Sequence, residues 1–182
     1  MAYRNCATQD EADAAAAAGD MIMWRAGNLV LRGSSSASLY NYSGATLYDS
    51  SYATLYDNSH ADLFGSSRAN LYDNSSAALH DRSIVVLHGN SSATDGITGA
   101  PLRRDRPRIV LGPLGSRADM LGVSLPSDGT EPIVYAGCWY GRLSAFAARV
   151  DAVYPASRYG DEYRAAIAMI RAVATMSPQG AT

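Results

Sequence analysis

Three residues in the second half of the chain are suited to holding an anion. Gly115, Ser116 and Arg117 close a GPLGSR loop over residues 112–117. Glycines allow successive backbone N–H groups to point at one ligand, a hydroxyl donates a hydrogen bond, and a guanidinium binds carboxylate or phosphate with two hydrogen bonds. The loop lacks the Lys-Ser/Thr pair of a nucleotide-binding P-loop, and no helix clearly follows it. It is therefore either an anion site or an ordinary turn with a structural arginine.

A second candidate group is the thiol of Cys138. A thiol or a serine hydroxyl becomes a catalytic nucleophile when a neighbouring base, often a histidine, activates it. All three histidines lie at positions 60–88, so such a pair would require that region to fold back on the later residues. We therefore expect Cys138 to be a buried structural thiol. The alternative is a small hydrolase or nucleotide-processing enzyme centred on Ser116, Arg117 and Cys138.

No cofactor or metal site is predicted. The Cys and His spacings match no metal motif, and no carboxylate pair stands out for acid–base chemistry. Aspartates at one repeat position, Asp49, Asp57, Asp73 and Asp81, are similar to those of calcium-binding β-rolls. Such rolls need a Gly-Gly-x-Gly-x-Asp arrangement to complete the oxygen shell, and those glycines are missing. Calcium is therefore the weaker interpretation of these aspartates.

A row of rings, one every eight residues, is another candidate for binding. Its members are Tyr40, Tyr48, Tyr56, Phe64, Tyr72, His80 and His88. Each follows a leucine that should point inward, so the rings should point outward and form ladders about 4.8 Å per step, in which they stack. Exposed rings could instead bind a sugar, a nucleobase or another protein. Tyr40, Tyr48, Tyr56 and Tyr72 are accordingly candidate ligand-binding residues.

The rings belong to an eight-residue repeat that runs from Ser35 to Ala93. Its first residue is Ser, its third Ala or Val and its fifth Leu, so these side chains face one side of an extended strand. Asp, Asn or Gly at position seven is typical of a turn. Stacked copies bury a face that one strand cannot, which predicts a parallel β-solenoid. Two octapeptides per coil would give about four coils and three would give about three, and the small core residues favour two.

The predicted fold class is mainly β: a short parallel β-solenoid with an N-terminal helical cap and a small C-terminal α+β domain. Residues 1–27 are predicted to cap the solenoid of residues 28–97 with a short helix, which begins at a capping box, and a strand. Residues 98–107 are predicted to form a Pro- and Arg-rich linker. Its arginines are either solvated or bind the acidic repeat. Residues 108–182 predict a three-stranded meander covered by two amphipathic helices.

Composition limits the partners. The formal net charge is −2 and every basic residue is Arg, which gives no strong nucleic-acid signal. Residues 27–97 carry three Arg and six Asp, whereas residues 98–182 carry ten Arg and seven acidic residues. No apolar run reaches the roughly 18 residues that would span a membrane, and the N-terminus carries acids where a signal peptide needs a basic start. Two cysteines form no disulfide framework, so we expect a cytoplasmic protein without membrane contact.

Two motifs carry a resemblance to known sequences. The octapeptides resemble S-A-T-V-x-A-Y-D repeats in uncharacterised proteins of bacteriophages, prophages and actinobacteria. The C-terminal motif is similar to a module of such phage proteins, and it consists of the GPLGSR loop, Gly137-Cys138-Trp139, Gly141 with Leu143 and Phe146, and Glu162-Tyr163 with Ala166-Ile167. The likeness covers residues 28–176. The fifth repeat position is Leu here rather than Ala, which implies a wider core.

The resemblance implies a phage or prophage accessory protein and no particular mechanism. Together with the ring row and the loop, it predicts a non-enzymatic scaffold for binding or oligomerisation. Such a scaffold would self-associate, or sequester a host protein or a small anionic signalling ligand, in the host cytosol. The alternatives are the small hydrolase centred on Ser116, Arg117 and Cys138, and a virion-associated structural protein.

Overall fold

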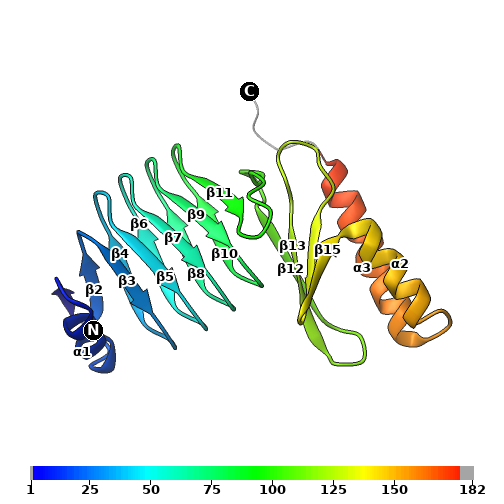
Figure 1. The fold of residues 1–182 in the computed structure, drawn as a ribbon, viewed down its shortest axis with the longest axis horizontal. Helices are drawn as coiled ribbons and strands as arrows, with labels where there is room; N and C mark the ends of the chain where they lie inside the picture. The colour runs from blue at the N-terminus through cyan, green and yellow to red at the C-terminus, as the bar shows by residue number, and fades with distance from the viewer. Residues whose placement is uncertain (1, 177–182) are drawn as a thin grey trace. The chain divides into compact units, whose positions relative to one another are not determined.

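The computed structural model describes residues 2–176. The chain divides into two compact units, Met1–Pro101 and Leu102–Thr182. The first unit is a two-sheet solenoid with a helix at its N-terminal end, and the second is an antiparallel sheet covered by two helices (Figure 1). The predicted fold class is confirmed.

From Met21 onward, the strands of the first unit alternate between two parallel sheets. One sheet contains, in order, β1 (Tyr3–Asn5), β2 (Met21–Trp24), β4 (Ser36–Leu39), β6 (Tyr52–Leu55), β8 (Arg68–Leu71) and β10 (Ile84–Leu87). The other contains β3 (Asn28–Leu31), β5 (Gly44–Leu47), β7 (His60–Leu63), β9 (Ser76–Leu79) and β11 (Ser92–Asp95). Ala37 pairs with Ala53, so two octapeptides make one coil, as the small core residues favour. The stack is longer than predicted because β1 and β2 extend it beyond the repeat.

Serine, alanine and leucine build the interior of the solenoid, as their alternation predicts. The position-five leucines from Leu39 to Leu79 have an exposed fraction of 0%. Several buried position-one serines bond locally, as where the Ser51 hydroxyl donates to the Tyr48 carbonyl at 2.7 Å. A buried hydroxyl without a partner costs free energy, and only Ser43 and Ser67 lack one among the described serines of this position. Serine therefore suits a position that is both small and internally hydrogen-bonded.

The N-terminal residues cover the first coil by two means. Helix α1 (Gln9–Ala17) begins at the predicted capping box of Thr8 and Glu11. The Gln9 side chain then pairs with the β3 backbone: its Nε2 donates to the Val30 carbonyl at 2.8 Å, and its Oε1 accepts from the Val30 N–H at 2.9 Å. Strand β1 occupies the edge of the other sheet by pairing with β2. This three-residue strand was not predicted because it is too short to show a periodic pattern.

The repeat ends at Asp95, where a leucine would be due. Asp95 lies opposite Leu79 and is fully buried. Its Oδ1 accepts hydrogen bonds from the N–H groups of Ile97 and Thr98 at 3.2 and 3.0 Å and from the Thr98 hydroxyl at 2.9 Å. A carboxylate with these donors ends the leucine stack and holds the following turn.

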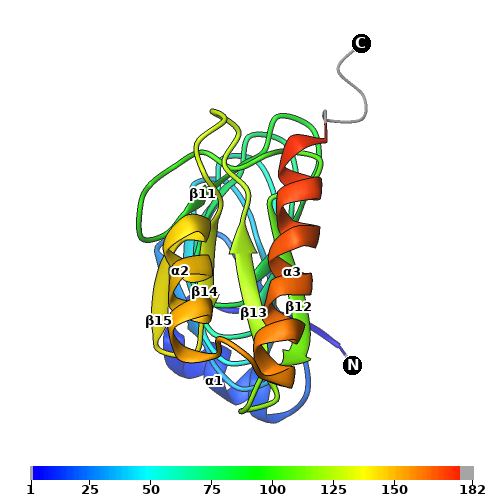
Figure 2. The same cartoon turned by 90° about the vertical axis from the view of Figure 1, so that its right-hand side faces the viewer.

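The second unit is a four-stranded antiparallel sheet with both helices on one face (Figures 1 and 2). Its elements are β12 (Arg108–Leu114), β13 (Asp119–Ser124), β14 (Ile133–Ala136), β15 (Trp139–Arg142), α2 (Leu143–Val153) and α3 (Arg158–Thr175). Val123 and Val134 pack against Phe146, Ile167 and Ile170 in its core. The sequence predicted three strands. The fourth, β15, was read as a turn into the helix because its glycine and the Gly-Cys before it mask its strand character.

The arginine-rich segment before β12 is not simply solvated. Arg103 is 8% exposed, donates to the carbonyl of Val173 at 3.3 Å near the end of α3, and pairs with Asp105 at 2.8 Å. The hydrogen bond from Arg103 holds the pKa of the Asp105 carboxyl below its ordinary value. Arg108 is likewise buried, with its guanidinium 4.7 Å from the ring centre of Tyr135. These two arginines are part of the second unit's structure.

Candidate functional site

A pocket of about 270 Å³ lies in the second unit between two hairpins and the helices. The hairpin of β12 and β13 contributes Ser116, Arg117 and Asp119, and the hairpin of β14 and β15 contributes Cys138 and Trp139. Further lining side chains come from α2 and α3; they are Phe146, Arg149, Val150, Val153, Tyr154 and Tyr163. The pocket thus gathers most of the motifs behind the resemblance, although they are far apart in sequence.

Gly115 shapes the loop rather than facing the pocket. Its N–H donates to Oε2 of Glu162 at 2.9 Å, so this amide already has an anionic partner. The residue has φ +71°, and a Cβ there would lie 2.0 Å from the hydroxyl oxygen of Tyr163. Only glycine fits this conformation and this approach. Of the three predicted loop residues, Ser116 and Arg117 therefore remain as pocket-lining groups.

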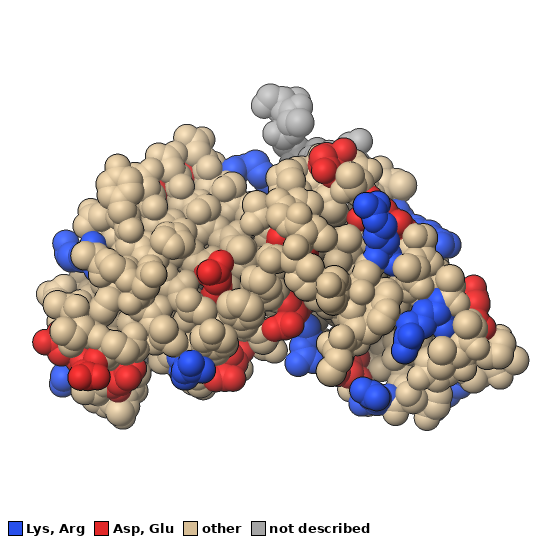
Figure 3. All heavy atoms as spheres, in the orientation of Figure 1, with Lys and Arg blue, Asp and Glu red and all other residues tan. Residues whose placement is uncertain are grey.

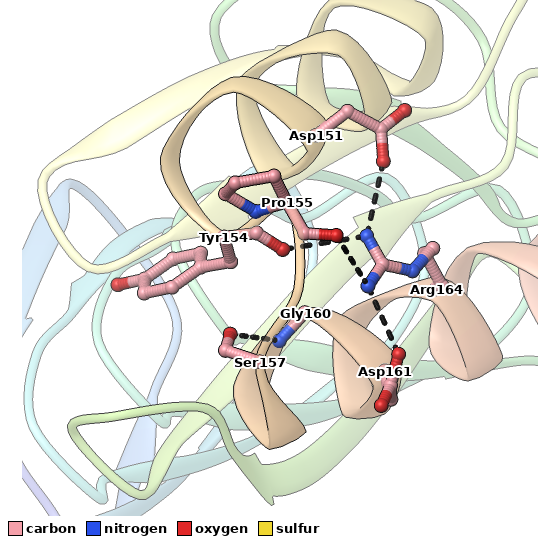
Figure 4. Close-up of polar contacts among 7 residues, drawn as sticks. All are labelled: Asp151, Tyr154, Pro155, Ser157, Gly160, Asp161 and Arg164. Atoms are coloured by element: carbon pink, nitrogen blue, oxygen red, sulfur yellow. Dashed lines mark hydrogen bonds and ion pairs between the residues drawn. The ribbon is translucent and has the colours of Figure 1, made fainter.

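Tyr154 joins the loop to the helical turn. Its hydroxyl lies 3.1 Å from the Ser116 hydroxyl. Arg164 holds the turn between α2 and α3, because its guanidinium donates to the carbonyls of Tyr154 and Pro155 at 3.4 and 3.5 Å and pairs with Asp151 and Asp161. Figure 4 shows this arrangement, with the Tyr154 ring directed away from Arg164. Arg164 thereby positions the side chain of Tyr154 through its backbone, without contacting the Tyr154 hydroxyl.

Aromatic rings form one wall of the pocket. Phe146 lies 5.5 Å from Trp139 and meets Tyr163 edge-on at 5.7 Å, while Tyr154 lies 5.8 Å from Tyr163 (centre to centre). Each ring is held by its neighbour, so the wall is preformed. Burial raises the pKa of the Tyr163 hydroxyl above its ordinary value, with Tyr154 as the next cause. The Tyr163 hydroxyl is therefore protonated at neutral pH.

Two guanidinium groups line the pocket without protein partners. Neither Arg117 nor Arg149 has a hydrogen bond or an ion pair with any residue of the described segment 2–176. Asp119 brings one carboxylate into the same pocket. On the face drawn in Figure 3 the second unit carries several blue arginine groups. The pocket therefore combines two available cations, one anion and several rings.

Cys138 is exposed, which contradicts its prediction as a buried thiol. It lies in the short connection of the β14–β15 hairpin, where side chains face solvent. Ser116, Arg117 and Cys138 do line one pocket, as the hydrolase alternative requires. No histidine is among the described lining residues, and the Ser116 hydroxyl lies next to the Tyr154 hydroxyl, which is not a base. The arrangement is thus better suited to binding than to nucleophilic attack.

The aromatic row of the first unit forms the two predicted ladders. Ring centres are 5.0, 5.3 and 4.4 Å apart along Tyr40, Tyr56, Tyr72 and His88, and 5.3 and 4.1 Å apart along Tyr48, Phe64 and His80. Arg25 lies over Tyr40 and Arg32 over Tyr48. The stacking prediction is confirmed. Stacking covers the ring faces inside each ladder and leaves the ring edges for a ligand. Ligand binding by Tyr40, Tyr48, Tyr56 and Tyr72 stays a prediction.

Sequence reasoning missed Arg149 and Trp139 as pocket residues. Arg149 lies three residues after Phe146 on the same helix, a spacing that places both side chains on neighbouring positions of one face. That spacing was the available signal. Trp139 was assigned only to a turn motif, and nothing local indicates what its ring contacts.

Comparisons leave the chain without an assigned family: no protein-family model, no curated protein and no solved structure matches it. Within residues 2–176, no group of three or more His, Cys, Asp or Glu residues could hold a metal ion. None of the helices in that described range combines the length and apolarity needed to cross a membrane.

Proposed function

We propose that this protein binds a small anionic ligand stoichiometrically in the pocket of its second unit, with the solenoid as a rigid scaffold. The observation that carries the proposal is that Arg117 and Arg149 share one pocket and have no hydrogen-bond or ion-pair partner among residues 2–176. Two like charges that share a pocket repel each other, and a bound anion replaces this repulsion by two attractions. The Ser116 hydroxyl adds a neutral donor.

The biological setting belongs to the same proposal. The resemblance of the octapeptides and of the C-terminal motif to phage and actinobacterial proteins supports a phage or prophage accessory protein that sequesters a small signalling ligand in the host cytosol. Capture of a host protein, self-association through the solenoid and attachment to a virion are the other roles open to such a scaffold.

Titration calorimetry with inorganic phosphate tests the anion site. We expect Arg117→Ala and Arg149→Ala each to weaken binding at least about tenfold, which corresponds to about 1.4 kcal/mol. Arg171→Ala is the matched control, because Arg171 is exposed on α3 outside the pocket and should leave affinity unchanged. Added salt should weaken binding by screening. No phosphate binding by the wild type, or equal affinities in all three variants, would contradict the proposal.

A small hydrolase is the second candidate, and the shared pocket position of Ser116 and Cys138 favours it over other enzymes. Incubation of nucleotides with the protein, first at an equal molar ratio and then with the nucleotide in excess, separates the two functions. We expect the ligand to be protected and recovered unchanged. Multiple turnover that is lost in Cys138→Ala or Ser116→Ala would instead establish the enzyme.

A further inference from the structure

One wall of the pocket presents a fixed indole ring. A Cβ on Gly141 would lie 2.9 Å from both Cη2 and Cζ2 of Trp139, so the ring lies directly against the Gly141 backbone. On another side it contacts Phe146, at 5.5 Å between centres and with 38° between the planes. These neighbours leave the Trp139 side chain little rotational freedom. A preordered ring loses little entropy when a flat ligand stacks on it.

The charges of the pocket are mixed rather than uniformly positive. Arg117 and Arg149 attract an anion, but the Asp119 carboxylate in the same pocket repels one. A carboxylate is instead an acceptor for sugar hydroxyls or for the N–H groups of a heterocycle. The hydroxyls of Ser116 and Tyr154 can donate or accept. A bare inorganic anion would use only the two arginines, whereas a molecule with an anionic end and a donor-bearing ring would use the carboxylate as well.

The size of the pocket limits the ligand further. Small-molecule pockets generally range from about 300 to 1,000 Å³, and this one, at about 270 Å³, is slightly below that range. It has space for about one nucleotide unit, that is, a base with its sugar and one phosphate, and not for a second unit.

We propose that the ligand is a nucleoside monophosphate, whose base stacks on Trp139 and whose phosphate binds Arg117 and Arg149. This inference rests on the proposed anion-binding function and adds a ring subsite to it. Asp119 then accepts hydrogen bonds from the sugar or the base. The residues named for this recognition all belong to the second unit.

Tryptophan fluorescence and calorimetry test the ring subsite with four kinds of probe: inorganic phosphate, ribose 5-phosphate, adenosine, and the monophosphates of adenosine, guanosine, cytidine and uridine. At least one monophosphate should bind tenfold or more tightly than ribose 5-phosphate and should quench the fluorescence. The other tryptophan, Trp24, is buried in the solenoid, so quenching reports on Trp139. Trp139→Leu should bind the monophosphate no more tightly than ribose 5-phosphate and should keep the wild-type affinity for ribose 5-phosphate. Trp139→Phe should retain most of the preference for the monophosphate.

The outcomes separate the two proposals. Equal affinity for ribose 5-phosphate and every monophosphate overturns the ring subsite and leaves the anion site intact. Adenosine that binds as tightly as its monophosphate, or no binding by any probe, overturns both. If Trp139→Leu fails to fold, as judged by circular dichroism, the wild-type protein alone still tests the ring subsite. Monophosphate binding without fluorescence quenching would contradict stacking on Trp139.

Discussion

At position seven of the repeat, the backbone takes a left-handed conformation that few residues adopt. Asp49, Asp57, Asp73 and Asp81 have φ between 48° and 59°, and Gly65 has φ 66° at the same position. The aspartates also bond across coils, as where Oδ2 of Asp57 accepts from the N–H of Asn41 at 2.8 Å. Asp, Asn and Gly tolerate this conformation best. The aspartate row is therefore explained by turn geometry and backbone hydrogen bonding.

Asp57 allows the two contributions to be separated. Asp57→Gly removes the bond to Asn41 but keeps an easy left-handed backbone, so it should destabilise the solenoid by about 1 kcal/mol. Asp57→Ala adds the strain of a Cβ in that region and should cost about 1–2 kcal/mol more. Urea unfolding followed by circular dichroism measures both. Equal stabilities for the glycine and alanine variants would mean that backbone strain is not what selects the residue.

Glu162 should make ligand binding sensitive to acid. The hydrogen bond from the Gly115 N–H, and next the contact with Arg158, hold the pKa of Glu162 below its ordinary value of 4.5. A lowered folded-state pKa means that this support is complete above 4.5 and is lost as the pH falls through the lowered value. Phosphate affinity should therefore drop below pH 4.5 as the Gly115 loop is released.

Glu162→Gln is the control for this pH dependence. The amide oxygen of glutamine can still accept from Gly115, but it does not titrate. The variant should therefore bind phosphate at neutral pH and lack the additional loss that the wild type shows in acid. Identical profiles for the two proteins would show that Glu162 does not hold the loop.

Among the elements, the exposed ends of the two sheets present the clearest physical problem. A terminal strand carries unpaired N–H and C=O groups that can recruit another chain. At the N-terminal end, β1 pairs with β2 in one sheet, and a single glutamine side chain bonds both backbone groups of Val30 in the other. An amide side chain can replace a strand here because it carries a donor and an acceptor, as a peptide unit does.

Gln9→Ala tests this cap. The loss of both bonds should destabilise the protein by about 1–3 kcal/mol and uncover the β3 edge, so that the protein associates in a concentration-dependent way. Sedimentation velocity over a range of concentrations measures the association. Asp10→Asn is the matched control, because Asp10 is exposed in the first turn of the same helix and the Gln9–Val30 bonds do not involve it. Association in both variants alike would argue against a capping role for Gln9.

At the scale of the whole molecule, the protein is modular in two senses. Each unit has its own core, and the pocket is formed entirely by residues of Leu102–Thr182. From β3 to β11, each strand pairs with the strand sixteen residues away, so these coils are nearly equivalent. Stability in such arrays is approximately a sum over repeats and their interfaces.

Deletion of residues 51–66 removes one coil and should leave both units folded. The β-rich circular dichroism should persist, the melting temperature should fall because one set of interfaces is lost, and phosphate affinity should stay within about twofold of wild type. Arg117→Ala in the shortened protein should still lose binding. Failure of the shortened protein to bind phosphate would show that the pocket depends on the length of the solenoid.

Much of the first unit could be predicted from the sequence because its structure is local and repeated. Alternation of Ser, Ala and Leu specifies which side of each strand is buried, and the residue at position seven specifies the turn. The capping box of Thr8 and Glu11 could likewise be predicted, since its two residues are only three positions apart. By contrast, the octapeptide alone does not specify how many octapeptides form one coil of the solenoid. That number depends on pairing between strands sixteen residues apart.

In the second unit the sequence determined less, because the pocket depends on long-range packing. The helices and three of the strands follow from periodicity, and Ser116 and Arg117 were identified from their loop. Only the tertiary structure brings Arg149 and Trp139 to that loop and turns Cys138 outward. The physical reason is that strand and helix patterns record burial along each segment, whereas a binding site forms where separate segments end together. By itself, therefore, the sequence determined the solenoid's repeating cross-section, and the fold decided which side chains share a cavity.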